Sequence, residues 1–164
     1  MAGGIKVAQA HDDSPLPSID RFSGKYAFLS NFYQCLIYLD GASYSSVEHA
    51  FQAAKTLDSA ERELIRHAPT AAMAKRLGRR ARLRPDWDEV KLDVMEGLLR
   101  QKFDPDRNHY RLLQETAGRE LIEGNNWRDF YWGVCSGVGE NWLGKLLMKV
   151  RDGDSDNDGA RGAE

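Results

Sequence analysis

The sequence contains only two cysteines, no long apolar run and almost no net charge, and each shortage excludes a class of protein. Cys35 and Cys135 lack the close spacing of a zinc site, and two cysteines are too few for a disulfide framework. The longest apolar runs, such as CLIYL, are far too short to cross a bilayer. The first residues lack the basic and then apolar pattern of a signal peptide. We therefore expect a cytoplasmic protein with no membrane partner.

Length and composition predict one globular domain. The chain has 164 residues, which is enough for one core and short for two. The net charge of −2 gives no global attraction to nucleic acid, so any binding of phosphates must be local. Residues 1–18 carry Gly, Pro and Asp with little periodicity and are predicted to be a flexible lead-in. Residues 19–151 are the predicted domain, and residues 152–164 are a predicted disordered acidic tail.

Hydrophobic periodicity predicts an α+β fold that is predominantly helical and has a small antiparallel sheet. In QCLIYLDGASY, an Asp-Gly pair between apolar segments is typical of a β-hairpin. The stretch ELIEG, at residues 120–124, is a possible further strand. Apolar residues at helical spacing predict helices at residues 47–54, 59–68, 70–81, 85–103, 108–116 and 141–150.

Two stretches resemble binding motifs. The tail DSDNDGARGAE begins like an EF-hand calcium loop, but Arg161 occupies the usually apolar eighth position, so we expect no calcium site. The basic run KRLGRRARLR, at residues 75–84, fits either a nucleic-acid backbone or a solvated helix face. No aromatic residue is interleaved with it for base stacking. The basic run therefore supports a function but does not establish one.

Glu48 has two interpretations in the stretch SSVEHAFQAAK. Ser45 and Glu48 have the spacing of a capping box, in which the two side chains satisfy free amides of the first helical turn. Glu48 could also be a catalytic carboxylate, with Gln52 and Lys55 on the same helix face. At a helix N-terminus it would be kept ionised. His49 is adjacent to Glu48, but neighbouring helix residues point apart, so the two are not expected to form an acid–base pair.

A second carboxylate, Asp129, lies in an aromatic stretch that leads into the glycine-rich loop GVCSGVGEN. Two carboxylates suit hydrolysis through an oxocarbenium-like ion, because one can stabilise the cation while the other handles a proton. The aromatic residues Trp127, Tyr131 and Trp132 could stack on a ring of a ligand. The glycines allow either a close approach to phosphate before the last helix or merely a tight connection. No Ser-His-Asp or metal-ligand spacing is present.

The order of five motifs resembles the NADAR, or YbiA-like, domain family. They are FLSNFY, SSVEHAFQAAK, WDEVKLDVMEGLLRQKF, LLQETAGRELIEGN and YWGVCSGVGENWLGKLLMKVR, and together they span residues 21–151. The resemblance implies a mainly helical α+β fold and hydrolysis of N-glycosidic bonds to ribose. The residues that match the family's functional landmarks are Glu48, Trp87 and Asp129. By motif match, the same pocket would be lined by Asn31, Lys55, Trp132, Gly133, Gly137, Gly139 and Asn141.

The resemblance implies two kinds of substrate, ADP-ribose attached to guanine in DNA and an early phosphorylated intermediate of riboflavin biosynthesis. We favour ADP-ribosylated DNA, because the basic run could contact its backbone. A module that binds ADP-ribose or NAD without catalysis is a third possibility. We expect Glu48 to stabilise a ribosyl cation, Asp129 to assist proton transfer, and Lys55 to pair with phosphate or form a Schiff base. No cofactor or metal is expected.

Overall fold

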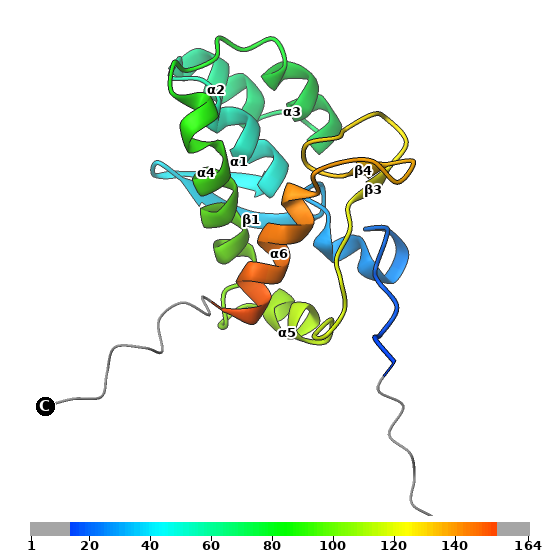
Figure 1. Ribbon diagram of the computed structural model, residues 1–164. Helices are drawn as coiled ribbons and strands as arrows, with labels where there is room; N and C mark the ends of the chain where they lie inside the picture. Colours follow the sequence, from blue (N-terminus) through cyan, green and yellow to red (C-terminus); the bar gives the residue numbers. More distant parts are fainter. Residues whose placement is uncertain (1–13, 154–164) are drawn as a thin grey trace, which may run out of the picture.

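The computed structural model describes residues 14–153 (Figure 1). The predictions made for residues 1–13 and 154–164, including the calcium-like pattern, lie outside the described residues. The helices are η1 (Gly24–Leu29), α1 (Val47–Ala54), α2 (Ser59–Arg66), α3 (Ala71–Gly78), α4 (Trp87–Lys102), α5 (Asn108–Gln114) and α6 (Trp142–Asp152). The strands are β1 (Gln34–Leu39), β2 (Ala42–Ser46), β3 (Gly124–Asn125) and β4 (Val134–Cys135). The predicted α+β class, mostly helical with a small antiparallel sheet, is confirmed.

The predicted hairpin is formed by β1 and β2. The two strands pair antiparallel up to Leu39 and Ala42, which leaves Asp40 and Gly41 as the two-residue turn. Both turn residues have positive φ, 49° at Asp40 and 78° at Gly41, as a type I′ turn requires. The turn therefore fixes the strand register, so that Ile37 and other alternate residues are buried against the helices.

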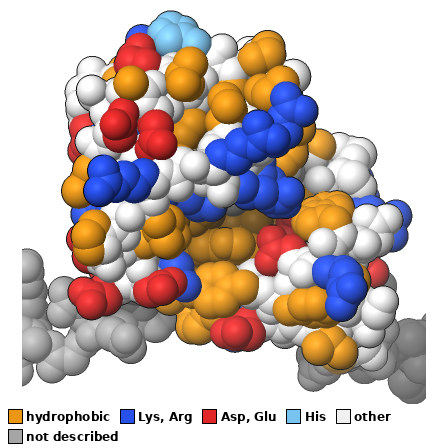
Figure 2. Space-filling view, turned by 90° about the horizontal axis from the view of Figure 1, so that it is seen from above, with side chains coloured by type: hydrophobic (Ala, Val, Ile, Leu, Met, Phe, Trp, Pro, Cys, Tyr) orange, Lys and Arg blue, Asp and Glu red, His pale blue; other side chains and the backbone are white. Residues whose placement is uncertain are grey.

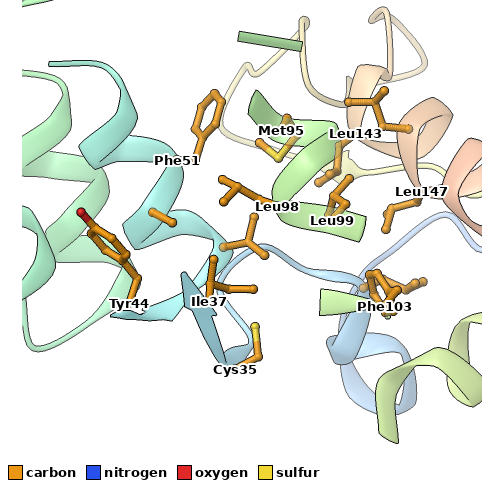
Figure 3. Packing of buried hydrophobic residues seen from close by; sticks show 14 of the residues in the cluster. Cys35, Ile37, Tyr44, Phe51, Met95, Leu98, Leu99, Phe103, Leu143 and Leu147 are labelled. Atoms are coloured by element: carbon orange, nitrogen blue, oxygen red, sulfur yellow. The ribbon is translucent and has the colours of Figure 1, made fainter. Parts of the chain in front are cut away.

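Helix α1 lies at the centre of the domain and contacts α2, α3, α4 and both strands of the hairpin. Every one of its residues is buried, including the polar residues Glu48, His49 and Gln52. Figure 3 shows the apolar core around it, where Phe51 lies near side chains of α4 such as Met95 and Leu98. Polar groups on α1 are therefore held rigidly by packing on several sides.

The predicted strand at ELIEG is wrong. Leu121 forms only an isolated bridge to Ile19, and the short strand β3 begins at Gly124. β3 pairs in parallel with β4 through two residue pairs, too few to give an alternating hydrophobic pattern. The segment is nevertheless fixed, because the Ile19 amide donates to the Glu120 carbonyl and the Ile122 amide donates to the Ile19 carbonyl, both at 2.8 Å.

Within residues 14–153, none of the helices has the length and apolar character needed to span a membrane. The predicted helices at residues 47–54, 59–68, 70–81, 85–103, 108–116 and 141–150 are all present as α1 to α6, with ends shifted by at most a few residues. Helix α6 packs on α4, and the loop from β3 to α6 lies beside α1 and α3 at one end of the molecule (Figure 1).

Candidate functional site

A cavity of about 180 Å³, called here the site cavity, lies between α1, α3 and the segment from Glu123 to Trp132. Figure 2 views the molecule from this end and shows a hollow with a hydrophobic floor and a row of basic side chains on one rim. Five predicted site residues line the cavity: Asn31, Glu48, Lys55, Asp129 and Trp132. The other lining residues are Ser30, Phe32, Phe51, Gln52, Lys75, Met95, Glu123, Trp127 and Leu143.

Glu48 is not part of a capping box. Helix α1 begins one residue later than the Ser45 cap would require, and the side chain of Ser46 accepts a hydrogen bond of 3.2 Å from the His49 amide. The Glu48 carboxylate instead accepts a hydrogen bond of 2.7 Å from Nε2 of Gln52. The Glu48 amide donates to the Asn31 carbonyl at 3.0 Å. Glu48 therefore points into the site cavity from a fully packed helix.

The electrostatics of Glu48 also differ from the expectation. Burial raises the pKa of the Glu48 carboxyl, and the positive charge of Lys75 and the hydrogen bond from Gln52 oppose this rise only in part. The helix N-terminus does not keep this side chain as ionised as the sequence suggested, because its carboxyl group is almost completely removed from water. A cation that forms beside Glu48 would restore its charged form.

Two lysines face the carboxylates from neighbouring helices. Lys55 follows the last turn of α1, and its Nζ lies 5.6 Å from the centre of the Phe51 ring. Burial lowers the pKa of the Lys55 amine, although the negative charge of Glu48 opposes this shift. Lys75, from α3 and the start of the basic run, places Nζ 5.7 Å from the Phe32 ring centre. The cavity therefore offers both a cation and an amine that deprotonates more readily than an ordinary lysine.

Asp129 is held by its own loop. Its amide donates to Oδ1 of Asn125 at 3.1 Å, and its carbonyl accepts from Nδ2 of Asn125 at 2.8 Å. One carboxylate oxygen, Oδ1, accepts from the amide of Trp132 at 2.9 Å. The loop is thereby closed around Asp129, and its side chain faces the cavity opposite α1.

Sequence reasoning missed Glu123, which brings a third carboxyl group to the site cavity. Burial, reinforced by the negative charge of Asp129, raises the pKa of Glu123 to about 7. Its Oε2 atom is buried and has no hydrogen-bond partner among the described residues. The only sequence signal was its place in ELIEG, just before the aromatic stretch that carries Asp129. Because this stretch was predicted to be a strand, Glu123 was not recognised as a site residue.

Two further acceptors of residues that line the cavity share this condition. Oδ1 of Asn31 and Oε1 of Gln52 are buried and have no hydrogen-bond partner within the described part of the chain, and Oε1 of Gln52 packs against Gly78 of α3. Leaving such an atom unpaired costs about 1–3 kcal/mol, so a ligand that donates hydrogen bonds here would recover that cost. Hydroxyl and amino groups are donors of this kind. The cavity thus suits a ligand rich in them.

Trp87 does not line the site cavity, contrary to the expectation from motif matching. Its side chain is buried behind the cavity wall, with its ring centre 5.0 Å from that of Phe51. Phe51 in turn contacts Trp132 edge-on, at 5.2 Å between ring centres. Trp87 therefore supports the aromatic wall from behind, because the first turn of α4 packs against α1.

The glycine loop and Asn141, the residue before α6, lie outside the site cavity, although Leu143 of α6 lines it. Gly137 lines a neighbouring cavity, called here the side cavity, which shares Ser30, Glu123 and Trp127 with the site cavity. Asn141 is buried, and its side chain is used by backbone groups of the segment that carries Glu123. Four residues that were expected to line the pocket therefore do not line the site cavity: Gly133, Gly137, Gly139 and Asn141.

The first amides of α6 are not available to phosphate as the sequence suggested. The Trp142 amide donates to the Tyr131 carbonyl at 3.1 Å, and the Leu143 amide donates to the Trp132 carbonyl at 3.0 Å. A helix start attracts anions only where its amides are unsatisfied. The lysines are thus the better partners for phosphate in this site. Between residues 14 and 153, no group of three or more His, Cys, Asp or Glu side chains is placed to hold a metal ion.

Comparisons with known proteins agree with this architecture. N-glycosidase YbiA of Escherichia coli (strain K12) is 41% identical over 133 residues, which cover 79% of this chain and 82% of that protein. A riboflavin biosynthesis protein of Vibrio vulnificus is 37% identical over 130 residues, covering 77% of this chain but 35% of that protein. The NMR structure of the E. coli protein YbiA has a TM-score of 0.72 and 39% identity, covering 82% of this chain and 83% of that one.

The family resemblance is also confirmed by the sequence profile of the NADAR domain, which matches residues 20–153. That range contains every residue of the site cavity, from Ser30 to Leu143. The chain belongs to the NADAR domain family.

Proposed function

We propose that this protein is an N-glycosidase that hydrolyses N-glycosidic bonds to ribose in the cytoplasm. The observation that carries the proposal is a single cavity in which three carboxyl groups, two lysines and aromatic walls converge. The name of the YbiA relatives, N-glycosidase, supports the same reaction class. Ribose has several hydroxyl donors, and one of them fits the unpaired Oδ1 acceptor of Asn31.

In the proposed reaction, Glu48 stabilises the positive charge that develops at C1 of ribose as the bond to nitrogen breaks. Its anchoring on α1 and its bond to Gln52 fix the carboxylate without any rearrangement during the reaction. Asp129 faces it across the cavity and accepts a proton from the attacking water. The two carboxylates thereby divide charge stabilisation and proton transfer.

Lys55 has two possible roles that one variant can separate. As a cation it would pair with a phosphate of the substrate, whereas as a neutral amine it would attack the ring-opened sugar and form a Schiff base. Lys55→Arg keeps the charge but cannot form the imine. If turnover survives in Lys55→Arg, Lys55 is a phosphate partner. If turnover is lost, and borohydride traps the sugar on the wild-type protein but not on the variant, Lys55 is the nucleophile.

We propose ADP-ribose attached to guanine bases of DNA as the substrate. A shallow pocket at the cavity mouth supports this choice, because it is lined by Arg79 and Arg128 and by the exposed rings of Trp127 and Phe130. Cations and stacking platforms of this kind suit a nucleic-acid strand. The second candidate is a phosphorylated intermediate of riboflavin biosynthesis, which is favoured by the name of the Vibrio vulnificus relative.

The test compares wild type and Glu48→Gln on guanine-ADP-ribosylated DNA and on the ribosylated riboflavin intermediate, with products identified by mass spectrometry. Release of ADP-ribose from DNA, lost in Glu48→Gln, would support the proposal in full. Release of ribose 5-phosphate from the small molecule alone would favour the second candidate. Binding of ADP-ribose without release from either substrate would refute catalysis and support a binding module.

A matched control is Glu89→Gln, the same chemical change near the start of another helix. Glu89 lies in the first turn of α4 and is exposed, away from the site cavity. The variant Glu89→Gln should leave turnover unchanged. An equal loss in both variants would show that the effect of Glu48→Gln is not specific to the site.

A further inference from the structure

The segment that leads into β3 brings Glu123 to the boundary between the site cavity and the side cavity. We propose that Glu123 is a catalytic acid that protonates the leaving nitrogen of the substrate, which extends from ribose in the site cavity toward the side cavity. This inference rests on the proposed N-glycosidase function. It adds a third working carboxyl group to Glu48 and Asp129 and gives it a separate role.

The backbone around Glu123 is held in place by the residues that motif matching had placed in the pocket. The Glu123 amide donates to Oδ1 of Asn141 at 3.0 Å, and its carbonyl accepts from the Val134 amide at 2.8 Å. A Cβ atom on Gly133 would lie 2.2 Å from the Glu123 carbonyl oxygen and 2.9 Å from its Cγ. One on Gly139 would lie 2.0 Å from the Gly133 carbonyl oxygen. The loop from Gly133 to Asn141 therefore holds the backbone of Glu123 in one position.

These contacts fix the backbone but leave one oxygen of the carboxyl group, Oε2, without a partner among the described residues. Oε2 is buried and no described residue satisfies it, although buried carboxyl oxygens are ordinarily bonded. Because the atom belongs to a side chain that lines the cavity, the missing partner is best supplied by a ligand. A protonated carboxyl group can donate to such a ligand, and an ionised one can only accept.

The groups that surround Glu123 determine how it titrates. Asp129 on the loop and Glu48 on α1 repel its ionised form, while Lys75 on α3 and Lys102 on α4 attract it. Burial and the two acids outweigh the two lysines, so that the pKa of Glu123 rises to about 7. At neutral pH, a large share of the molecules then carries the proton that the leaving group needs.

The proposed step is balanced as follows. The bond between C1 of ribose and the leaving nitrogen breaks, its electron pair goes to nitrogen, and the Glu123 proton follows it. Water adds to C1 and loses one proton to Asp129. Transfer of that proton from Asp129 to Glu123, which interact electrostatically, restores the starting state. The products are the free amine and the free sugar, and no further reactant is consumed.

The experiment measures kcat and KM for wild type and Glu123→Gln on the amine-linked substrate and on the 4-nitrophenyl glycoside of the same sugar. The nitrophenolate leaves without needing a proton, so it reports every function of the site except acid catalysis. We expect kcat on the amine-linked substrate to fall about 10²- to 10⁴-fold, the usual contribution of a positioned acid. On the nitrophenyl glycoside, kcat should fall less than about tenfold, since only the proton donor is missing.

The pH profile gives a second readout. An acid must be protonated to act, so wild-type kcat/KM on the amine-linked substrate should decline as pH rises through the pKa of Glu123, about 7. In Glu123→Gln this decline should vanish. A matched control is Glu120→Gln, three positions earlier in the same segment with an exposed side chain, which should behave like wild type.

Three outcomes would overturn the assignment. Equal losses of Glu123→Gln on both substrates would make Glu123 a structural residue. Retention of wild-type kcat and of the alkaline decline would remove it from catalysis, while the N-glycosidase function would stand. Failure of the wild-type protein to release product from any N-ribosyl substrate would refute the proposed function and the role of Glu123 together.

Discussion

Replacing Asn141 should destabilise the protein strongly, because this side chain connects α6 to the segment that carries Glu123. Its Oδ1 accepts from the Glu123 amide at 3.0 Å, and its Nδ2 donates to the Leu121 carbonyl at 2.9 Å. Asn141 also has a φ of 55°, in the left-handed region. Gly144 leaves room for it, since a Cβ atom there would lie 2.5 Å from Nδ2 of Asn141.

The magnitude follows from two separable costs. Asn141→Ala leaves the part-buried Glu123 amide and the buried Leu121 carbonyl without these partners, at about 1–2 kcal/mol each. An alanine in the left-handed conformation adds about 1 kcal/mol, whereas glycine adopts it freely. We therefore expect the free energy of unfolding to fall by about 3–5 kcal/mol in Asn141→Ala and by about 1 kcal/mol less in Asn141→Gly.

The assay is urea-induced unfolding of wild type, Asn141→Ala and Asn141→Gly under one set of conditions. Asn126→Ala is the matched control, because Asn126 is an exposed asparagine in the same part of the fold and should change stability by less than about 0.5 kcal/mol. Losses below about 1 kcal/mol in both Asn141 variants would refute the argument that this side chain holds the segment. Equal losses of stability in Asn141→Ala and Asn141→Gly would refute only the contribution of the left-handed backbone.

Three further predictions concern the charges and the exposed ring of the site. The pKa of Glu123 is raised to about 7 in the folded protein, so the folded state loses stability as pH rises from about 4.5 to 7. In urea unfolding, Glu123→Gln should therefore stabilise the protein by about 1–3 kcal/mol at pH 8 and give little gain at pH 4.5. Lys102 is buried with a pKa lowered to about 8, so wild-type stability should gain a contribution as pH rises from about 8 to 10, and Lys102→Met should lack that gain; an identical pH dependence would contradict a buried ammonium. Trp127 is 55% exposed at the cavity mouth, so Trp127→Ala should weaken ADP-ribose binding by about tenfold or more in calorimetry while unfolding changes little, and unaltered affinity would exclude stacking.

Most of the fold could be predicted because its signals are local. The Asp-Gly pair fixed the hairpin turn at Asp40 and Gly41, where both residues need positive φ. The apolar stripe of α1 and the long amphipathic segment that becomes α4 were likewise recognisable by helical spacing. The pairing of β3 with β4 was not, because two-residue strands joined by a loop leave no periodicity to detect.

The site could be predicted only in part, because sequence motifs do not tell a residue that touches a ligand from one that holds such a residue. Glu48, Lys55 and Asp129 belong to recognisable motifs and do meet in one cavity. Asn141 and Gly133 belong to equally recognisable motifs, yet they support the backbone of Glu123 from behind. That difference depends on contacts between segments distant in sequence, and no spacing rule contains it.

The balance of charge in the cavity links the stability of the fold to the proposed chemistry. Five ionisable side chains line it: Glu48, Glu123, Asp129, Lys55 and Lys75. If all five were ionised, the formal charge would be −1 in a partly buried space, where each uncompensated charge is costly. One proton shared among the carboxyl groups brings the formal sum to zero, and burial raises the pKa of both Glu48 and Glu123. When that proton is on Glu123, the proton that relieves this repulsion is also the one that a leaving nitrogen requires.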